Sequence, residues 1–197
     1  MSRRVFDLIT SAGGAVAVVV LVIAGGLLTW GHSFVSSNVH DQLARQQITF
    51  PSRAAFAHAK PGTEITPGMI PYLERYAGQQ MTTGDQAKAY ADHFIAVHLS
   101  EMPYGGVYSK ISAAAMAQPK NTSLAALKQV SFQGTTLRGL LLEAYAFATI
   151  GTVMLWGAIA AFVGALLMSL LVAVGIWHAR RTPAEERLLA GRAIAQV

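Results

Sequence analysis

The stretch Leu8–Trp30 reads LITSAGGAVAVVVLVIAGGLLTW and holds no Asp, Glu, Lys or Arg. A second uncharged stretch, Ala144–Trp177, reads AYAFATIGTVMLWGAIAAFVGALLMSLLVAVGIW. Apolar runs of this length without charge predict helices that cross a membrane. We therefore expect an all-α membrane protein, in which two transmembrane helices form a helical hairpin and a mainly helical external domain lies between them.

The composition agrees with this class. Apolar residues make up 53% of the 197 residues and charged residues 13%, which is typical of membrane proteins. The chain has no Cys, which excludes disulfides, thiolate metal sites, iron–sulfur clusters and c-type haem attachment. The pI near 9.7 comes without a basic patch interleaved with aromatic residues, so it favours contact with lipid and not with nucleic acid.

Flanking arginines predict the orientation. Arg3 and Arg4 precede the first stretch, and four arginines follow the second, so both ends are expected in the cytoplasm of a plasma-membrane protein. The expected segments are a cytoplasmic N-tail (1–7), the first span (8–30), a periplasmic-side domain (31–143), a long helix (144–177) and a cytoplasmic C-tail (178–197). A cleaved signal peptide is the competing interpretation, but the run is too long and no A-x-A-like site follows it.

The second stretch is too long for one bilayer. Its 34 residues make about 51 Å of helix, whereas a hydrocarbon core measures about 30 Å. Trp156 and Trp177 are about 32 Å apart along a helix, and tryptophan favours membrane interfaces. The second span is therefore predicted at about 156–177, with Trp30, Trp156 and Trp177 as interface anchors.

The remainder of this stretch, Ala144–Leu155, is then expected above the membrane and buried in protein, because it is apolar on nearly all sides. We expect one unbroken helix from about Thr136 to Arg181. The first helix is expected to continue beyond Trp30 along a stripe of Phe34, Val35, Val39 and Leu43, so that the two extensions form a stalk.

Small residues predict a helix-packing face on the second span, made of Gly157, Ala161, Gly164 and Ala165. Two interpretations stay open: packing within the hairpin, or contact with a partner membrane subunit. Enlarging Gly157 or Ala161 to Leu is expected to weaken that packing, and Val172→Leu is expected to be milder.

Within the external domain, an extended segment, Ile48–Pro51, is expected to end the extension of the first helix, and short helices are expected to follow it. These are Met69–Tyr76, a helix Asp85–Ser100 capped by Thr83 and Gln86, Val107–Gln118, and Leu124–Val130, which Gly134 should separate from the last long helix.

No catalytic, cofactor-binding or metal-binding signature is present, so we predict no such site and no enzyme activity. His98 lies on an apolar helix face, either as a hydrogen-bonded core residue or as a partner of Glu101 for a proton or a metal. His32 and His178 end different spans and are expected a membrane thickness apart, which excludes a haem clamped between them. A ligand pocket would draw on the aromatic residues Tyr72, Tyr76, Tyr90 and Phe94.

Three stretches carry a resemblance to a known family: Leu27–Trp30 with Asn38–Leu43 and Ile48–Pro51, then Asp85–His93, then Gly134–Leu141. They resemble a family of actinobacterial two-span membrane proteins, one type of which is similar to an accessory subunit of the mycobacterial respiratory supercomplex. The resemblance implies cytochrome oxidase or cytochrome bcc subunits as partners and no site residues of its own.

The expected function is therefore a non-catalytic accessory or assembly subunit of a larger membrane complex, with other integral membrane subunits and lipid as partners. The alternative is a stand-alone, membrane-anchored ligand-sensing or ligand-binding module.

Overall fold

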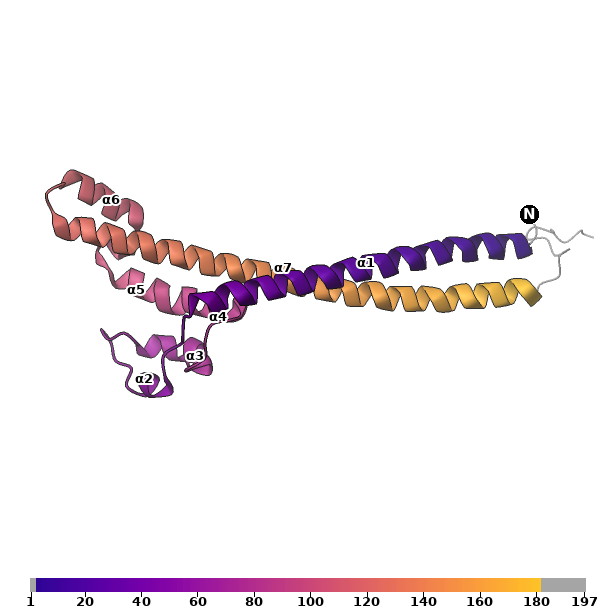
Figure 1. Cartoon of the computed structure of the whole chain (residues 1–197), viewed down its shortest axis with the longest axis horizontal. Helices are drawn as coiled ribbons and strands as arrows, with labels where there is room; N and C mark the ends of the chain where they lie inside the picture. The colour runs from indigo at the N-terminus through magenta and orange to yellow at the C-terminus, as the bar shows by residue number, and fades with distance from the viewer. Residues whose placement is uncertain (1–2, 182–197) are drawn as a thin grey trace, which may run out of the picture. The chain divides into compact units, whose positions relative to one another are not determined.

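The computed structural model describes residues 3–181 (Figure 1), and every regular element in them is helical. Of the expected cytoplasmic C-tail (178–197), the part from Thr182 onward lies outside the described residues. The chain divides into two compact units, the first made of Met1–His32 with Val153–Val197 and the second of Ser33–Thr152. The helices α1 (Arg3–Gln46) and α7 (Thr122–Arg181) each contribute to both.

Both α1 and α7 are long and apolar enough to cross a membrane. Their most apolar 18-residue windows have mean hydropathies of 2.3 and 2.6, yet only 11% and 6% of those windows is buried within the chain. A core helix of a soluble protein buries most of its apolar surface. These two helices instead present theirs outward, which is how a lipid-facing helix is built.

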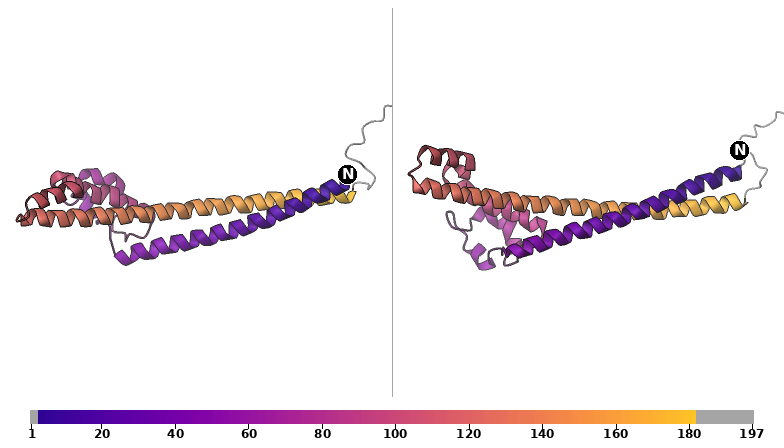
Figure 2. Two further views of the ribbon diagram at one scale, coloured as in Figure 1. Left: turned by 90° about the horizontal axis from the view of Figure 1, so that it is seen from above. Right: turned by 45° about the horizontal axis from the view of Figure 1, so that its top comes forward.

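In the first unit, α1 and α7 pack side by side in opposite directions, the indigo start of α1 beside the yellow end of α7 (Figures 1 and 2). A methyl group added at Gly14 would lie 2.6 Å from Val172 Cγ2, and one added at Gly25 would lie 2.9 Å from the Phe162 ring. Small residues thus let the backbones of α1 and α7 approach, a kind of packing that is common between membrane helices. Val172 therefore faces α1 at Gly14. The expectation that Val172→Leu is milder than enlarging Gly157 or Ala161 stays a prediction.

The inward positions of this pair follow a heptad rhythm. On α7 the less exposed residues recur at alternating steps of four and three: Met154, Ala158, Ala161, Ala165, Met168, Val172, Gly175 and Ala179. Such alternation keeps one seam against the partner helix, as in a coiled coil. In several contacts along the seam, a large side chain of one helix lies against a glycine of the other, so the two helix axes can lie close together.

The second unit has an apolar core in which Phe50, Met69, Leu73 and Met81 are almost completely buried. Two extended segments that contribute Phe50 and Met81 to this core are hydrogen-bonded to each other. Phe50 N–H donates to Gln79 O (2.9 Å), and Met81 N–H donates to Ile48 O (2.8 Å). The predicted extended stretch at Ile48–Pro51 is therefore confirmed in its backbone conformation.

The short helices of the second unit follow in chain order. They are α2 (Arg53–Ala57), η1 (Pro67–Met69), α3 (Ile70–Leu73), η2 (Glu74–Tyr76), α4 (Gly84–Tyr90), the π-helical η3 (Ala91–Ile95), α5 (Ala96–Glu101), η4 (Pro103–Gly106) and α6 (Tyr108–Ala117). The predicted capping box is confirmed: the Thr83 side chain accepts from Gln86 N–H, and the Gln86 side chain accepts from Thr83 N–H. All views place α6 beside the start of α7 (Figures 1 and 2).

The break expected at Gly134 is wrong, because α7 runs without interruption from Thr122. The Asn121 side chain caps it by accepting from Leu124 N–H. A methyl group at Gly134 would lie 2.8 Å from Leu99 Cδ2, so this glycine allows α5 to approach α7 closely. A glycine within a helix can serve packing instead of ending the helix.

Candidate docking groove in the second unit

A groove of about 430 Å³ lies between α1 and α7 in the second unit. Its walls are mostly apolar, and amide side chains and one carboxylate form its rim. The lining residues are Phe34, Val35, Asn38, Val39, Gln42, Leu43, Gln46, Leu137, Leu140, Leu141, Glu143, Ala144 and Phe147. We call this the apolar groove.

The floor of the apolar groove is fixed by the core beneath it. Val39, Leu43 and Leu141 are buried there, as the predicted stripe on α1 requires. Farther along, a methyl group at Gly151 would lie 3.4 Å from Val35 Cγ1, so the two helices are in contact at that end of the unit. The groove is therefore a space between two anchored helices.

The outer wall of the apolar groove is left uncovered by the chain. Leu140 is 58% exposed, Phe147 48% and Ile150, one turn farther on, 47%. The expectation that Ala144–Leu155 is buried within the protein is therefore wrong for Phe147 and Ile150. On the predicted α1 stripe, Phe34 is 59% exposed, whereas Val39 and Leu43 are buried. The second unit is too small to wrap α7 on all sides.

The rim of the groove was not recognised from the sequence. Gln42 Nε2 donates a 2.6 Å hydrogen bond to Asn38 Oδ1, so these amides bond to one another. The signal was available: Asn38 and Gln42 are four residues apart and flank the apolar stripe of Val35, Val39 and Leu43.

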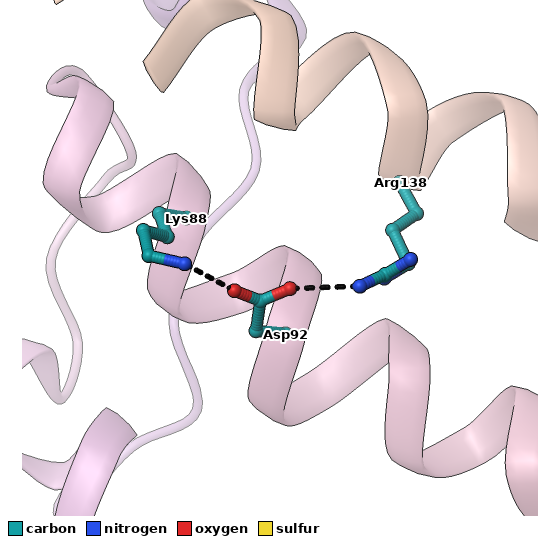
Figure 3. Close-up of polar contacts among 3 residues, drawn as sticks. All are labelled: Lys88, Asp92 and Arg138. Atoms are coloured by element: carbon teal, nitrogen blue, oxygen red, sulfur yellow. Dashed lines mark hydrogen bonds and ion pairs between the residues drawn. The ribbon is translucent and has the colours of Figure 1, made fainter. Parts of the chain in front are cut away.

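An ion-pair cluster ties the short helices to α7 (Figure 3). Asp92 accepts from Lys88 Nζ on α4 and from Arg138 NH2 on α7, the latter at 2.9 Å. The hydrogen bond from Lys88, followed by that from Arg138, lowers the pKa of Asp92, and the Asp92 carboxylate raises the pKa of Lys88. The cluster holds α7 in register one turn before the groove residue Leu141.

A second cleft, of about 490 Å³, is more polar. It is lined by Ser36, Val39, His40, Thr82, Thr83, Gly84, Asp85, Tyr145, Ala148, Thr149 and Thr152. Gly84 lets α4 approach α7 closely at this cleft, because an added methyl group would collide with Ala148 Cβ. No group of three or more His, Cys, Asp or Glu among residues 3–181 has the arrangement of a metal site.

The predicted packing residues lie along the contact between α1 and α7 in the first unit. Ala161 and Ala165 are buried, and methyl groups at Gly157 and Gly164 would lie 3.2 Å from Leu28 Cδ1 and 3.5 Å from Leu21 Cδ1. The described contacts of these four residues are thus with the chain's own α1. A partner subunit at this face stays a prediction.

The three tryptophans are all outward-facing, with Trp30 68%, Trp156 66% and Trp177 55% exposed. Because Leu28 lies beside Gly157 and Gly31 beside Met154, Trp30 and Trp156 lie at the same end of the antiparallel pair. Trp177 lies at the other end, where the Arg181 guanidinium is 4.2 Å from its ring centroid. This distribution suits two interfacial belts.

The histidines and aromatic residues of the second unit are mostly used in packing. His98 Nδ1 donates to the Phe94 carbonyl oxygen at 2.7 Å, which agrees with the hydrogen-bonded interpretation. Tyr76 and Tyr90 pack on Phe50, and Tyr72 stacks on His93, so these rings line neither of the two clefts. Burial raises the pKa of Tyr90, with the Glu64 charge adding to it.

The two ends of the first unit keep His32 and His178 apart. His178 Nε2 lies 4.0 Å from Asp7 Oδ2, whereas His32 is about 38 Å farther along α1 than Asp7.

Comparison with known proteins gave no match to any family model, to any curated protein or to any solved structure.

Proposed function

We propose that this chain is a non-catalytic accessory or assembly subunit of a larger membrane complex. In this proposal α1 and α7 form a transmembrane hairpin, both termini lie in the cytoplasm, and the second unit lies on the periplasmic side of the plasma membrane. The resemblance noted in the sequence favours a respiratory complex, with cytochrome oxidase or cytochrome bcc subunits as the partners.

One observation carries the proposal: the exposed apolar wall formed by Leu140, Phe147 and Ile150. The wall adjoins an uncharged run that continues to Trp177. Apolar surface left in water costs about 25 cal/mol for each Å². Because this wall continues into a proposed membrane span, the protein that covers it is most simply another integral membrane subunit. One helix of that subunit would lie in the apolar groove.

The experiment is purification of the tagged chain from its native membrane in mild detergent, with mass spectrometry and a haem spectrum of the same sample. We expect a stoichiometric partner set and haem absorption. A chain that is recovered alone contradicts the accessory role, and stoichiometric partners without haem contradict only the respiratory assignment.

Substitution at the groove residue Phe147 and at Ile150, one turn beyond the groove, sharpens this test. Phe147→Ser together with Ile150→Ser should reduce partner recovery about tenfold, because aromatic anchors dominate such contacts. Thr149→Gln on the opposite side of the same turn of α7 is the control and should retain the partner. Equal recovery from both variants would show that the groove is not the contact.

The stand-alone ligand-binding alternative draws its support from the polar cleft beside His40, Asp85 and Tyr145. It requires that ligands protect the isolated chain against thermal unfolding. A library of small polar molecules that leaves the Tm unchanged would remove it.

A further inference from the structure

The end of the second unit formed by η4, α6 and the beginning of α7 carries exposed apolar side chains of its own. Tyr108 and Phe132 form a ring pair with centroids 5.6 Å apart, and they are 37% and 50% exposed. Other apolar residues of these elements are also exposed: Tyr104, Val107, Met116 and Val130. With Lys110, Lys120 and Lys128, these residues make up what we call the basic tip.

The backbone of the basic tip is held in an uncommon conformation. Tyr104 has φ +60°, which is rare for a residue other than glycine, and Gly106 follows at φ +67°. The buried Ser131 hydroxyl donates to the Gly106 carbonyl oxygen at 2.7 Å and fixes the loop to α7. Such conformations persist only where the surroundings determine them, so the exposed rings are displayed on a rigid support.

The charges along the sequence of the basic tip have one sign. Between Met102 and Leu142 the sequence contains Lys110, Lys120, Lys128 and Arg138 and no Asp or Glu. Arg138 is paired with Asp92, whereas none of the ion pairs among residues 3–181 includes the three lysines. Lys128 lies one turn before Phe132 on the same face of α7.

We propose that the basic tip docks on an acidic surface of another protein, with Tyr108 and Phe132 as its apolar anchors. Aromatic anchors inside a polar rim are the usual composition of protein interfaces. The lysines of that rim select a partner of opposite charge and speed its approach. This surface is separate from the apolar groove, and the proposal does not depend on which complex the groove binds.

An anionic bilayer is the other surface that attracts lysines beside aromatic rings. Helices that lie on bilayers insert a broad apolar face of large side chains. Between Tyr108 and Met116 the exposed residues of α6 are Ser109, Lys110 and Ala113, so this helix has no continuous apolar face of large side chains. The basic tip therefore fits a protein partner better than a lipid surface.

The test places the photoreactive amino acid p-benzoylphenylalanine at position 132 of the full chain in its native membrane. Irradiation should join this position to one protein, within a peptide of net negative charge. Adding Lys110→Glu and Lys128→Glu should lower the crosslink yield about tenfold, because two favourable rim contacts become repulsive. High salt should also lower the crosslink yield of the chain without the lysine substitutions.

The controls use the same chemistry elsewhere in the second unit. Arg53→Glu with Lys60→Glu also reverses two exposed positive charges, but outside the tip, and should leave the crosslink at position 132 intact. The photoreactive group at the exposed Glu74 should give no such product. Absence of a crosslink, crosslinking to lipid, a partner peptide without negative charge, or a yield unaffected by the lysine reversals would each overturn the proposal. The Phe147 variants test the groove independently, so the two failures are distinguishable.

Discussion

Two pairs of adjacent glycines in α1 offer a controlled test of the helix contact in the first unit. Gly14 and Gly25 face α7, where an added methyl group would lie 2.6 Å from Val172 Cγ2 and 2.9 Å from the Phe162 ring. Their neighbours Gly13 and Gly26 have nothing within 4 Å of the same added atom. The four positions thus share sequence context and differ in what they face.

The expected cost follows from these distances. Each Gly→Ala change gains similar intrinsic helix propensity, about 1 kcal/mol in water, so this term cancels between neighbours. The inward methyl groups must displace a stiff β-branched side chain or an aromatic ring, and such overpacking typically costs about 1–3 kcal/mol. Gly14→Ala combined with Gly25→Ala should therefore be about 2–6 kcal/mol less stable than Gly13→Ala combined with Gly26→Ala.

The assay is equilibrium unfolding of the purified chain in mixed micelles, titrated with a denaturing detergent and followed by tryptophan fluorescence. Trp30, Trp156 and Trp177 report on the first unit because all three lie within it. Equal midpoints for the inward and outward double variants would refute the close approach of α1 and α7 at these glycines.

Three further predictions use other contacts. In this cysteine-free chain, Ser11→Cys with Gly175→Cys should form a disulfide on mild oxidation, since the two Cβ atoms would lie 3.8 Å apart. Gly13→Cys with Gly175→Cys is the control and should form none. Electrophoresis with and without reductant, after the chain is cleaved between the two cysteines, shows whether the two pieces are joined. Gly106→Ala should unfold or strongly destabilise the second unit, because its methyl group would lie 2.1 Å from the Leu99 carbonyl oxygen at φ +67°, whereas Gly105→Ala meets only the backbone strain; thermal unfolding by circular dichroism compares them. Because the pKa of Asp92 is lower in the folded chain than in the unfolded chain, its ionised carboxylate stabilises the fold fully above the unfolded pKa, and this stabilisation is lost as the pH falls through the folded pKa. Asp92→Asn should therefore lower the free energy of unfolding at pH 7 by about 1 kcal/mol and remove part of its acid dependence below about pH 4. An unchanged dependence of stability on pH would contradict the ion-pair assignment.

The sequence was sufficient for the parts of the fold that depend on local pattern. Uncharged length predicted α1 and α7, and the Thr83 to Gln86 spacing predicted a cap, because both signals act within one helix. The extension of α1 to Gln46 also followed from the stripe of Val39 and Leu43.

Prediction failed where a tertiary contact decides the meaning of a residue. Gly134 resembles a helix break until Leu99 is known to lie against it. The apolar groove was not predicted because its walls come from helices about 100 residues apart in the sequence, and the exposed face of Phe147 depends on how little of α7 the short helices cover.

The antiparallel contact in the first unit also has a consequence for biosynthesis. Ser11 is synthesised 164 residues before its neighbour Gly175. At roughly 5–20 residues per second, α1 waits about 8 seconds or longer for its partner. During that interval the small-residue side of α1 is open to any neighbouring helix, so the order of synthesis makes α1 the segment on which a chaperone or a foreign subunit can act first.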